Sequence, residues 1–160
     1  MQLLVVAIGR LKQGPERDLA LHYAKRIDAA GRVVAFGPLG VVELAESRAA
    51  TAELRKAEEA GRLLAAAAKA DTLIALDETG NGSSSRQFAQ LLGKLRDDGC
   101  GRLAFAIGGP DGLGPDLRAM ASRSLSLGSL TLPHGLARII ILEQIYRAVT
   151  LLSGHPYHRD

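Results

Sequence analysis

The sequence predicts an α/β fold with a mainly parallel sheet of about five strands and flanking helices. The first observation behind this prediction is that short apolar runs alternate with longer amphipathic segments, the pattern of repeated strand–helix units. The second is that loops rich in Gly, Ser and Pro directly follow apolar runs, most clearly within residues 124–138. The third is composition, because 47% hydrophobic and 23% charged residues are typical of a globular protein. At 160 residues we expect one domain with its own core.

The chain is expected to begin with a strand and a helix. Residues 2–8 form a continuous apolar run closed by Gly9, which is typical of a strand buried on both faces. Pro15 suits the first turn of the helix that follows. Gly31 is expected at the C′ position that ends this helix.

A bent strand and a long helix are predicted next. Residues 32–44 are rich in β-branched side chains and are interrupted by Gly37 and Pro38, so we expect a strand with a bend or loop. Residues 47–70 are rich in the strong helix formers Ala, Leu, Glu and Lys, and therefore predict a long covering helix.

The middle of the chain predicts two further strand–helix units. Residues 72–77 are a short buried strand, and residues 78–84 are expected to be a loop. Ser84 followed by Gln87 matches a capping box and predicts the start of a helix. Residues 103–107 are the next apolar strand.

The last third contains the loops of greatest interest. Residues 108–114 are a glycine-rich loop, after which Pro115 opens a short helix. Alternating Ser and Leu in residues 124–127 predict a short strand, and Gly128 ends it. A long apolar helix is predicted over residues 136–152, followed by a polar tail.

This last helix is too apolar to be covered by one sheet contact. We therefore expect a second burial partner, and a two-fold dimer is the simplest one. The alternative is a helix that lies at the centre of one domain.

Charge and cysteine content limit the classes of function. A net charge of +3 permits a nucleic-acid partner without requiring one. A single cysteine, Cys100, allows no disulfide within the chain and fits a reducing compartment. No signal peptide and no membrane-spanning segment are predicted, so we expect a cytoplasmic protein. No metal site is expected, because His155 and His158 lack further ligands at suitable spacing.

Three loops compete as ligand sites, because ligands bind where loops leave the carboxyl ends of parallel strands. They follow Asp77, Ile107 and Leu127. The second loop, IGGPDGLG, lacks both the Lys-Ser/Thr of a P-loop and the glycine spacing of a dinucleotide site. Two adjacent glycines after a buried strand nevertheless favour close approach of the backbone to a ligand.

The closing residues HPYHR offer stacking and phosphate contacts of the kind that unstacked RNA bases use. The alternative interpretation is a frayed terminus.

Six segments of the chain resemble one family nearly from end to end: VVAIGR, LDETGNGSSSRQFA, FAIGGPDGLG, SLSLGSLTLPHGLAR, ILEQIYRA and HPYHRD. This family is the ribosomal large-subunit (23S rRNA) pseudouridine N3-methyltransferases, the minimal members of the SPOUT, or α/β-knot, methyltransferase superfamily. The resemblance is densest from Leu76 onward, where several motifs occur in order. It is vague over residues 29–70.

The resemblance implies an S-adenosylmethionine-dependent homodimer with a C-terminal trefoil knot and no separate RNA-binding domain. Its target would be a stem-loop pseudouridine of 23S rRNA in the assembled ribosome. The cofactor contacts carried over by position are Leu76, Gly108, Leu127, Gly128, Ser129, Leu130, Thr131 and Leu132. These residues fall in the three loops that sheet geometry nominates.

The N3–H of the target must lose its proton, which calls for a base or a stabilising cation. His134 and Arg138 are the candidates for this catalytic role by position. The expected RNA contacts are His155, Tyr157, His158 and Arg159. A tRNA methyltransferase of the same superfamily and a non-catalytic regulator that binds S-adenosylmethionine remain alternatives.

Overall fold

The structure is a computed structural model that describes residues 1–156. In chain order its elements are β1 (Gln2–Ile8), α1 (Pro15–Gly31), the 3-10 helix η1 (Arg32–Val34), β2 (Leu39–Leu44), α2 (Ala52–Ala67), β3 (Thr72–Gly82), α3 (Ser85–Asp97), β4 (Arg102–Ile107), α4 (Pro115–Met120), β5 (Arg123–Ser126) and α5 (His134–Ser153). The predicted α/β class is confirmed.

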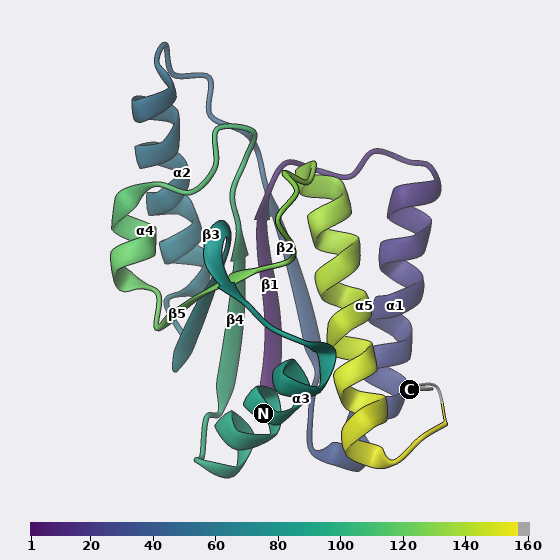
Figure 1. The fold of residues 1–160 in the computed structure, drawn as a ribbon. Helices are drawn as coiled ribbons and strands as arrows, with labels where there is room; N and C mark the ends of the chain where they lie inside the picture. The colour runs from purple at the N-terminus through teal and green to yellow at the C-terminus, as the bar shows by residue number, and fades with distance from the viewer. Residues whose placement is uncertain (157–160) are drawn as a thin grey trace.

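The five strands form one sheet in the order β2-β1-β4-β3-β5, and every neighbouring pair is parallel. The strands therefore run in one direction, and β1 and β4 end at the upper edge of the sheet in Figure 1. Strand β3 bends back at this edge and ends lower, where α3 begins (Figure 1). The connections that leave this edge are the ones expected to carry a ligand site.

Helices cover both faces of the sheet. Helices α1, α3 and α5 pack on one face, and α2 and α4 pack on the other (Figure 1). Neighbouring residues of the inner strand β1 point to opposite faces, so that Val5 joins the first core and Val6 joins the second. The apolar run at the start of the chain is thus a strand buried on both sides, as expected.

Two local predictions are confirmed in detail. Pro15 occupies the first turn of α1. At α3, the Ser84 hydroxyl accepts a hydrogen bond from the Gln87 backbone N–H at 3.2 Å, and the Gln87 side chain accepts one from the Ser84 N–H at 2.9 Å. This is the reciprocal capping box that the sequence indicates.

The prediction of a strand with a bend or loop over residues 32–44 is confirmed only for its second part. Only Leu39–Leu44 is strand, and Arg32–Val34 continues from α1 as a 3-10 turn. Gly31 is helical, with φ −62°, and Ala35 adopts the left-handed conformation that the sequence assigned to the glycine. A Cβ on Gly31 would lie 2.8 Å from the Phe36 carbonyl oxygen, so the glycine provides space for the returning chain.

Three element boundaries also differ from expectation. Strand β3 continues through the predicted loop to Gly82, because residues 81–82 pair with β5 after a register shift. Helix α2 starts only after Thr51, which caps it. Helix α5 starts at His134, so His134 belongs to its first turn.

Helix α5 finds its burial partners within the same chain. Ten of its residues, including Ile141, Ile145 and Val149, are buried in the single chain. Its neighbours are α1 and α3 (Figure 1). The apolar character of the helix therefore does not by itself require a second chain, and the dimer stays a prediction.

Candidate functional site

A cavity of about 580 Å³ opens at the carboxyl edge of the sheet. It is formed by residues 76–78 of β3, by the loops that follow β4 and β5, and by the first turn of α5. The three places nominated from the sequence, after Asp77, Ile107 and Leu127, thus meet at one cavity, although the first of them is still part of β3. Their meeting follows from the sheet order, since β3 lies between β4 and β5 and runs parallel to both.

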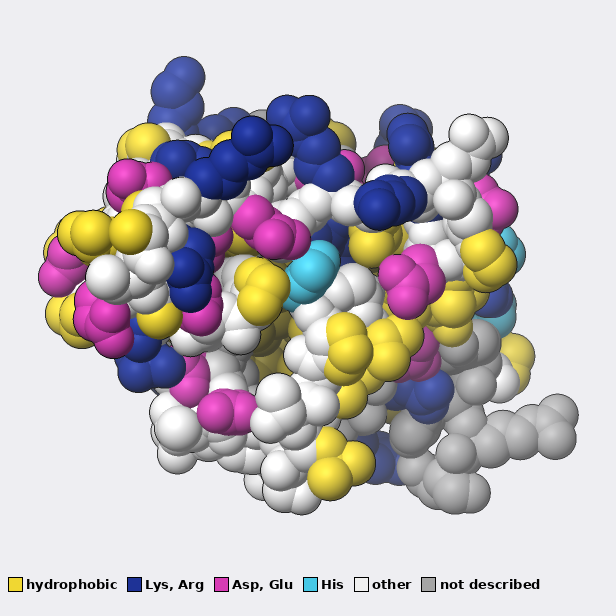
Figure 2. Space-filling model, turned by 90° about the horizontal axis from the view of Figure 1, so that it is seen from above, with side chains coloured by type: hydrophobic (Ala, Val, Ile, Leu, Met, Phe, Trp, Pro, Cys, Tyr) yellow, Lys and Arg dark blue, Asp and Glu magenta, His cyan; other side chains and the backbone are white. Residues whose placement is uncertain are grey.

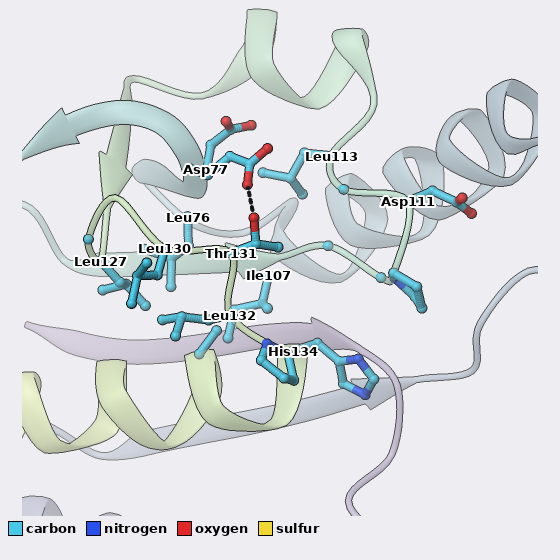
Figure 3. Close-up of a pocket in the computed structure, with 18 of the residues that line it drawn as sticks. Leu76, Asp77, Ile107, Asp111, Leu113, Leu127, Leu130, Thr131, Leu132 and His134 are labelled. Atoms are coloured by element: carbon cyan, nitrogen blue, oxygen red, sulfur yellow. Dashed lines mark hydrogen bonds between the residues drawn. The ribbon is translucent and has the colours of Figure 1, made fainter.

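Seven of the eight residues expected to contact the cofactor line this cavity: Leu76, Gly108, Leu127, Gly128, Leu130, Thr131 and Leu132. Ser129 is exposed and is not part of the lining. Figure 3 shows the labelled apolar side chains between Asp77 at one side of the cavity and His134 at the other. The lining is therefore apolar along its middle and polar towards its ends.

The backbone comes very close together at Gly108. A Cβ there would lie 2.8 Å from the Gly112 carbonyl carbon and 3.0 Å from Leu113 Cδ2. Gly112 itself has φ +83° and donates its N–H to the Gly109 oxygen at 2.9 Å, which makes a tight turn. The glycines of this loop therefore allow its backbone to pack tightly where it lines the cavity.

Helix α2 holds the same loop from outside. Arg55 donates two hydrogen bonds to Asp111, from Nε at 2.6 Å and from Nη2 at 3.1 Å. This hydrogen bonding raises the pKa of Arg55 and lowers the pKa of Asp111. A bidentate pair fixes the orientation of both groups, so the position of the loop depends on α2.

His134 lines the cavity at the start of α5. Its ring lies over Gly9, at the end of β1, where a Cβ would lie 2.5 Å from the imidazole Nε2. Gly9 has φ +86°, a conformation that glycine adopts readily. The end of β1 thus places this imidazole beside the cavity.

Arg138 lies one turn further along α5 and does not line the cavity. It is 1% exposed, forms an ion pair with Glu43 of β2, and donates to the Gly9 oxygen at 2.7 Å. Burial lowers the pKa of Arg138, and the charge of Glu43 opposes this shift. The guanidinium of Arg138 therefore faces the ends of β1 and β2, outside the cavity lining that includes His134.

The expected RNA-contacting residues fall at the limit of the described chain. His155 is exposed, and its backbone N–H donates to the Thr150 oxygen at 2.9 Å, which closes the end of α5. Tyr157, His158 and Arg159 lie outside the described residues.

Asp77 and Arg118 were not identified from the sequence. Asp77 ends the buried part of β3, with its side chain 3% exposed, and forms a 2.6 Å ion pair with Arg118 of α4. Burial raises the pKa of Asp77, but hydrogen bonds from Thr79 and Arg118 outweigh this effect, so the pKa lies below its usual value. The sequence signal for Asp77 is an acidic residue directly after a buried apolar strand.

Within residues 1–156, no group of three or more His, Cys, Asp or Glu side chains is arranged to hold a metal ion. The helices of the same range do not combine the length and apolarity that crossing a bilayer requires.

Comparison with known proteins gives full-length matches. The family model described as "Predicted SPOUT methyltransferase" matches residues 1–158. A protein of Rhizobium meliloti (strain 1021) named ribosomal RNA large subunit methyltransferase H is 56% identical over 159 residues, 99% of each chain. A protein of the same name from Brucella anthropi is 52% identical over 160 residues, 100% of both chains.

A solved structure has the same overall fold. The crystal structure of a probable methyltransferase from Bordetella pertussis Tohama I matches with a TM-score of 0.55 and 17% sequence identity. The match covers 92% of this chain and 96% of that one. At this identity the likeness concerns the fold alone.

Proposed function

The chain belongs to the SPOUT methyltransferase family, and we propose that it is a ribosomal RNA large-subunit methyltransferase. The reaction is transfer of the methyl group of S-adenosylmethionine to N3 of a pseudouridine in 23S rRNA. The observation that carries the proposal is that Leu76, Gly108 and Leu127, from three separate segments, line one cavity beside His134. Relatives that match the whole chain and carry the name of an rRNA methyltransferase support the substrate class.

The residues of the cavity fit S-adenosylmethionine. The apolar middle, with Leu76, Ile107 and Leu132, suits the flat adenine ring. The backbone around Gly108 is packed so closely that this part of the cavity lining has no room for a side chain. The charged side chains of the lining are Asp77, Glu78, Asp111 and Arg118, a net charge of −2 that suits a cofactor with an overall positive charge.

The chemistry divides between the cofactor and the protein. S-adenosylmethionine supplies an already activated methyl group when bound. The protein must align the target base and remove the N3 proton. We assign this proton to His134, because a neutral imidazole accepts a proton and His134 is the histidine in the cavity lining.

In this scheme Arg138 does not take part in the proton transfer but holds other residues in place. Its guanidinium joins the start of α5 to Gly9 at the end of β1 and to Glu43 of β2. It thereby holds His134 and its supporting glycine in one fixed arrangement. We therefore assign Arg138 a positioning role in place of the catalytic one expected from the sequence.

RNA would approach the same edge of the protein. Figure 2 shows this edge from above, with Lys and Arg side chains gathered along one side of the face and a His side chain near its centre. Arg10 and Lys12 are exposed in the connection that follows Gly9. Such cations suit phosphate groups, and His155, Tyr157, His158 and Arg159 would add base stacking and a further phosphate contact.

We also propose that residues 1–160 form a single domain and that two such chains form a homodimer. The homodimer would work in the cytoplasm, where ribosomes are. Leu130 in the cavity lining and Leu136 in the first turn of α5 are 76% and 41% exposed. Apolar side chains that remain exposed beside a site support a second chain there. Both subunits would then supply the RNA-binding surface.

The trefoil knot belongs to the same proposal. A Cβ on Gly80 of β3 would lie 2.7 Å from the Ser124 carbonyl carbon and 2.8 Å from Leu125 N. The main chain at Gly80, in the extension of β3, thus passes very close to the main chain of β5. This close crossing supports a threaded arrangement of the cofactor loops.

The test is methyl transfer from radiolabelled S-adenosylmethionine to three acceptors. We expect label in the 23S rRNA of assembled ribosomes and none in tRNA. Label in tRNA alone would favour the related tRNA enzymes. Binding of S-adenosylmethionine with transfer to neither acceptor would favour a regulator.

A further inference from the structure

Asp77 and Arg118 form a fixed ion pair in the wall of the cavity. The Asp77 carboxylate is saturated on one oxygen by Thr79, whose backbone N–H donates at 2.9 Å and whose hydroxyl donates at 2.6 Å. Its other oxygen accepts from Arg118 Nε at 2.6 Å. Because Asp77 is held at both oxygens, it fixes the direction in which the guanidinium points.

The remaining face of Arg118 is available to a ligand. Asp77 engages only Nε, and within residues 1–156 neither terminal Nη group has a hydrogen-bond acceptor. The side chain is 47% exposed and belongs to the cavity lining. An arginine held through Nε presents its two Nη groups as a pair of donors, the geometry that binds a carboxylate.

The positive charge of Arg118 distinguishes it from the other residues of the cavity lining. Among the described residues that line the cavity, Arg118 is the one Lys or Arg, beside three carboxylates. S-adenosylmethionine carries a sulfonium, an ammonium and one carboxylate. The acidic lining suits the two cationic groups, but the carboxylate requires a donor of positive charge or a backbone amide.

We propose that Arg118, oriented by Asp77, binds the carboxylate of the methionine portion of S-adenosylmethionine. This inference rests on the proposed function, because it names a contact within the same cofactor cavity. Asp77 is the positioning residue, and Arg118 is the residue that touches the ligand.

A phosphate of the RNA is the competing ligand for such a cation. The cavity itself favours the cofactor, since Arg118 shares its lining with Leu76, Gly108 and Leu127. The exposed cations Arg10 and Lys12 lie in the connection after β1, outside this lining. They suit the phosphates of a large substrate better.

The experiment compares two ligands that differ only in the carboxylate: S-adenosylmethionine and its decarboxylated form. Their affinities are measured by titration calorimetry for the full chain, for Arg118→Ala and for Arg118→Lys. The matched control is Arg123→Ala, which removes an exposed cation at the amino end of β5, away from the cavity.

In Arg118→Ala, affinity for S-adenosylmethionine should fall by about 10-fold or more, as expected for loss of a charged hydrogen bond. Affinity for the decarboxylated ligand should stay unchanged or rise, because a nearby positive charge has been removed. Arg118→Lys should restore part of the loss, and Arg123→Ala should bind both ligands like the unmodified chain.

Three results would overturn the inference. An equal loss for both ligands would mean that Arg118 only shapes the cavity. Unchanged affinity for both, with a raised KM for ribosomes, would assign Arg118 to an RNA phosphate. Failure of the unmodified chain to bind either ligand would remove the cofactor site, and the proposed function with it.

Discussion

The imidazole of His134 lies so close to Gly9 that a Cβ on the glycine would lie 2.5 Å from Nε2. This contact joins the end of β1 to the first turn of α5. It places His134 in the cavity wall, and only glycine leaves room for it.

Gly9→Ala should displace His134 and slow methyl transfer by more than about 10-fold, since the added methyl occupies the position of the ring. Cofactor affinity should change little. The matched control is Gly14→Ala, because Gly14 also has a positive φ, +149°, but a Cβ there meets nothing within 4 Å. Methylation rates are measured with both variants.

A double-mutant cycle makes this prediction specific. If Gly9→Ala acts through the imidazole, adding it to His134→Ala should cause no further loss of rate. Fully additive losses would contradict a role for the contact.

Gly108→Val should weaken cofactor binding by at least about 10-fold while circular dichroism stays close to that of the unmodified chain. The reason is that a side chain at Gly108 meets the backbone of Gly112 and must push the loop into the cavity or away from it. Gly61→Val on α2 is the control, because a Cβ there meets nothing within 4 Å. Unchanged affinity in calorimetry would mean that the cofactor lies elsewhere.

Asp77→Asn should lower the free energy of unfolding near pH 7 by about 1–3 kcal/mol, because a buried charged hydrogen bond is lost. The pKa of Asp77 in the folded protein lies below its ordinary value of 3.8. Its ionised form therefore stabilises the fold above that value, and the stabilisation is lost as the pH falls through the folded-state pKa. Denaturant titrations should show the difference between the two proteins narrowing below about pH 4. A difference that stays constant with pH would contradict the ion pair.

Truncation after Ser153 should reduce methylation of ribosomes by well over about 10-fold, since one stacked base alone contributes about 1–3 kcal/mol. Cofactor affinity and dimerisation should be nearly unchanged. Arg159→Ala should give a smaller loss in the same direction. Full activity of the truncated chain would move the RNA contacts to the surface around His134, and loss of cofactor binding would show that the tail closes the cavity.

Much of the fold could be predicted because its signals are local. The apolar run of β1, Pro15 at the start of α1, and the Ser84–Gln87 capping box each act within a few residues. The cavity could also be placed, since parallel strands bring their carboxyl ends to one edge whatever their order.

The errors come from interactions between distant residues. Residues 78–82 look like a loop, yet part of them pairs with β5, more than forty residues later. The buried position of Arg138 could not be predicted either, because its partners Glu43 and Gly9 are 95 and 129 residues away in the sequence. The Asp77–Arg118 pair is hidden for the same reason, because its members are 41 residues apart.

The helix α5 shows a further limit. Its composition correctly indicates burial on more than one side. Composition does not say whether the covering surface comes from the same chain. Here α1 and α3 supply it.

The central proposal is that this cavity directs a methyl group to N3 of a pseudouridine in 23S rRNA. The most direct measurement is mass spectrometry of nuclease fragments of ribosomal RNA, after ribosomes lacking this methyl group are incubated with the protein and S-adenosylmethionine. One fragment of 23S rRNA should gain a single methyl group on N3 of a pseudouridine, and Gly108→Val should abolish the gain. A methyl group on another atom or another RNA, or none in any fragment, would contradict the proposal.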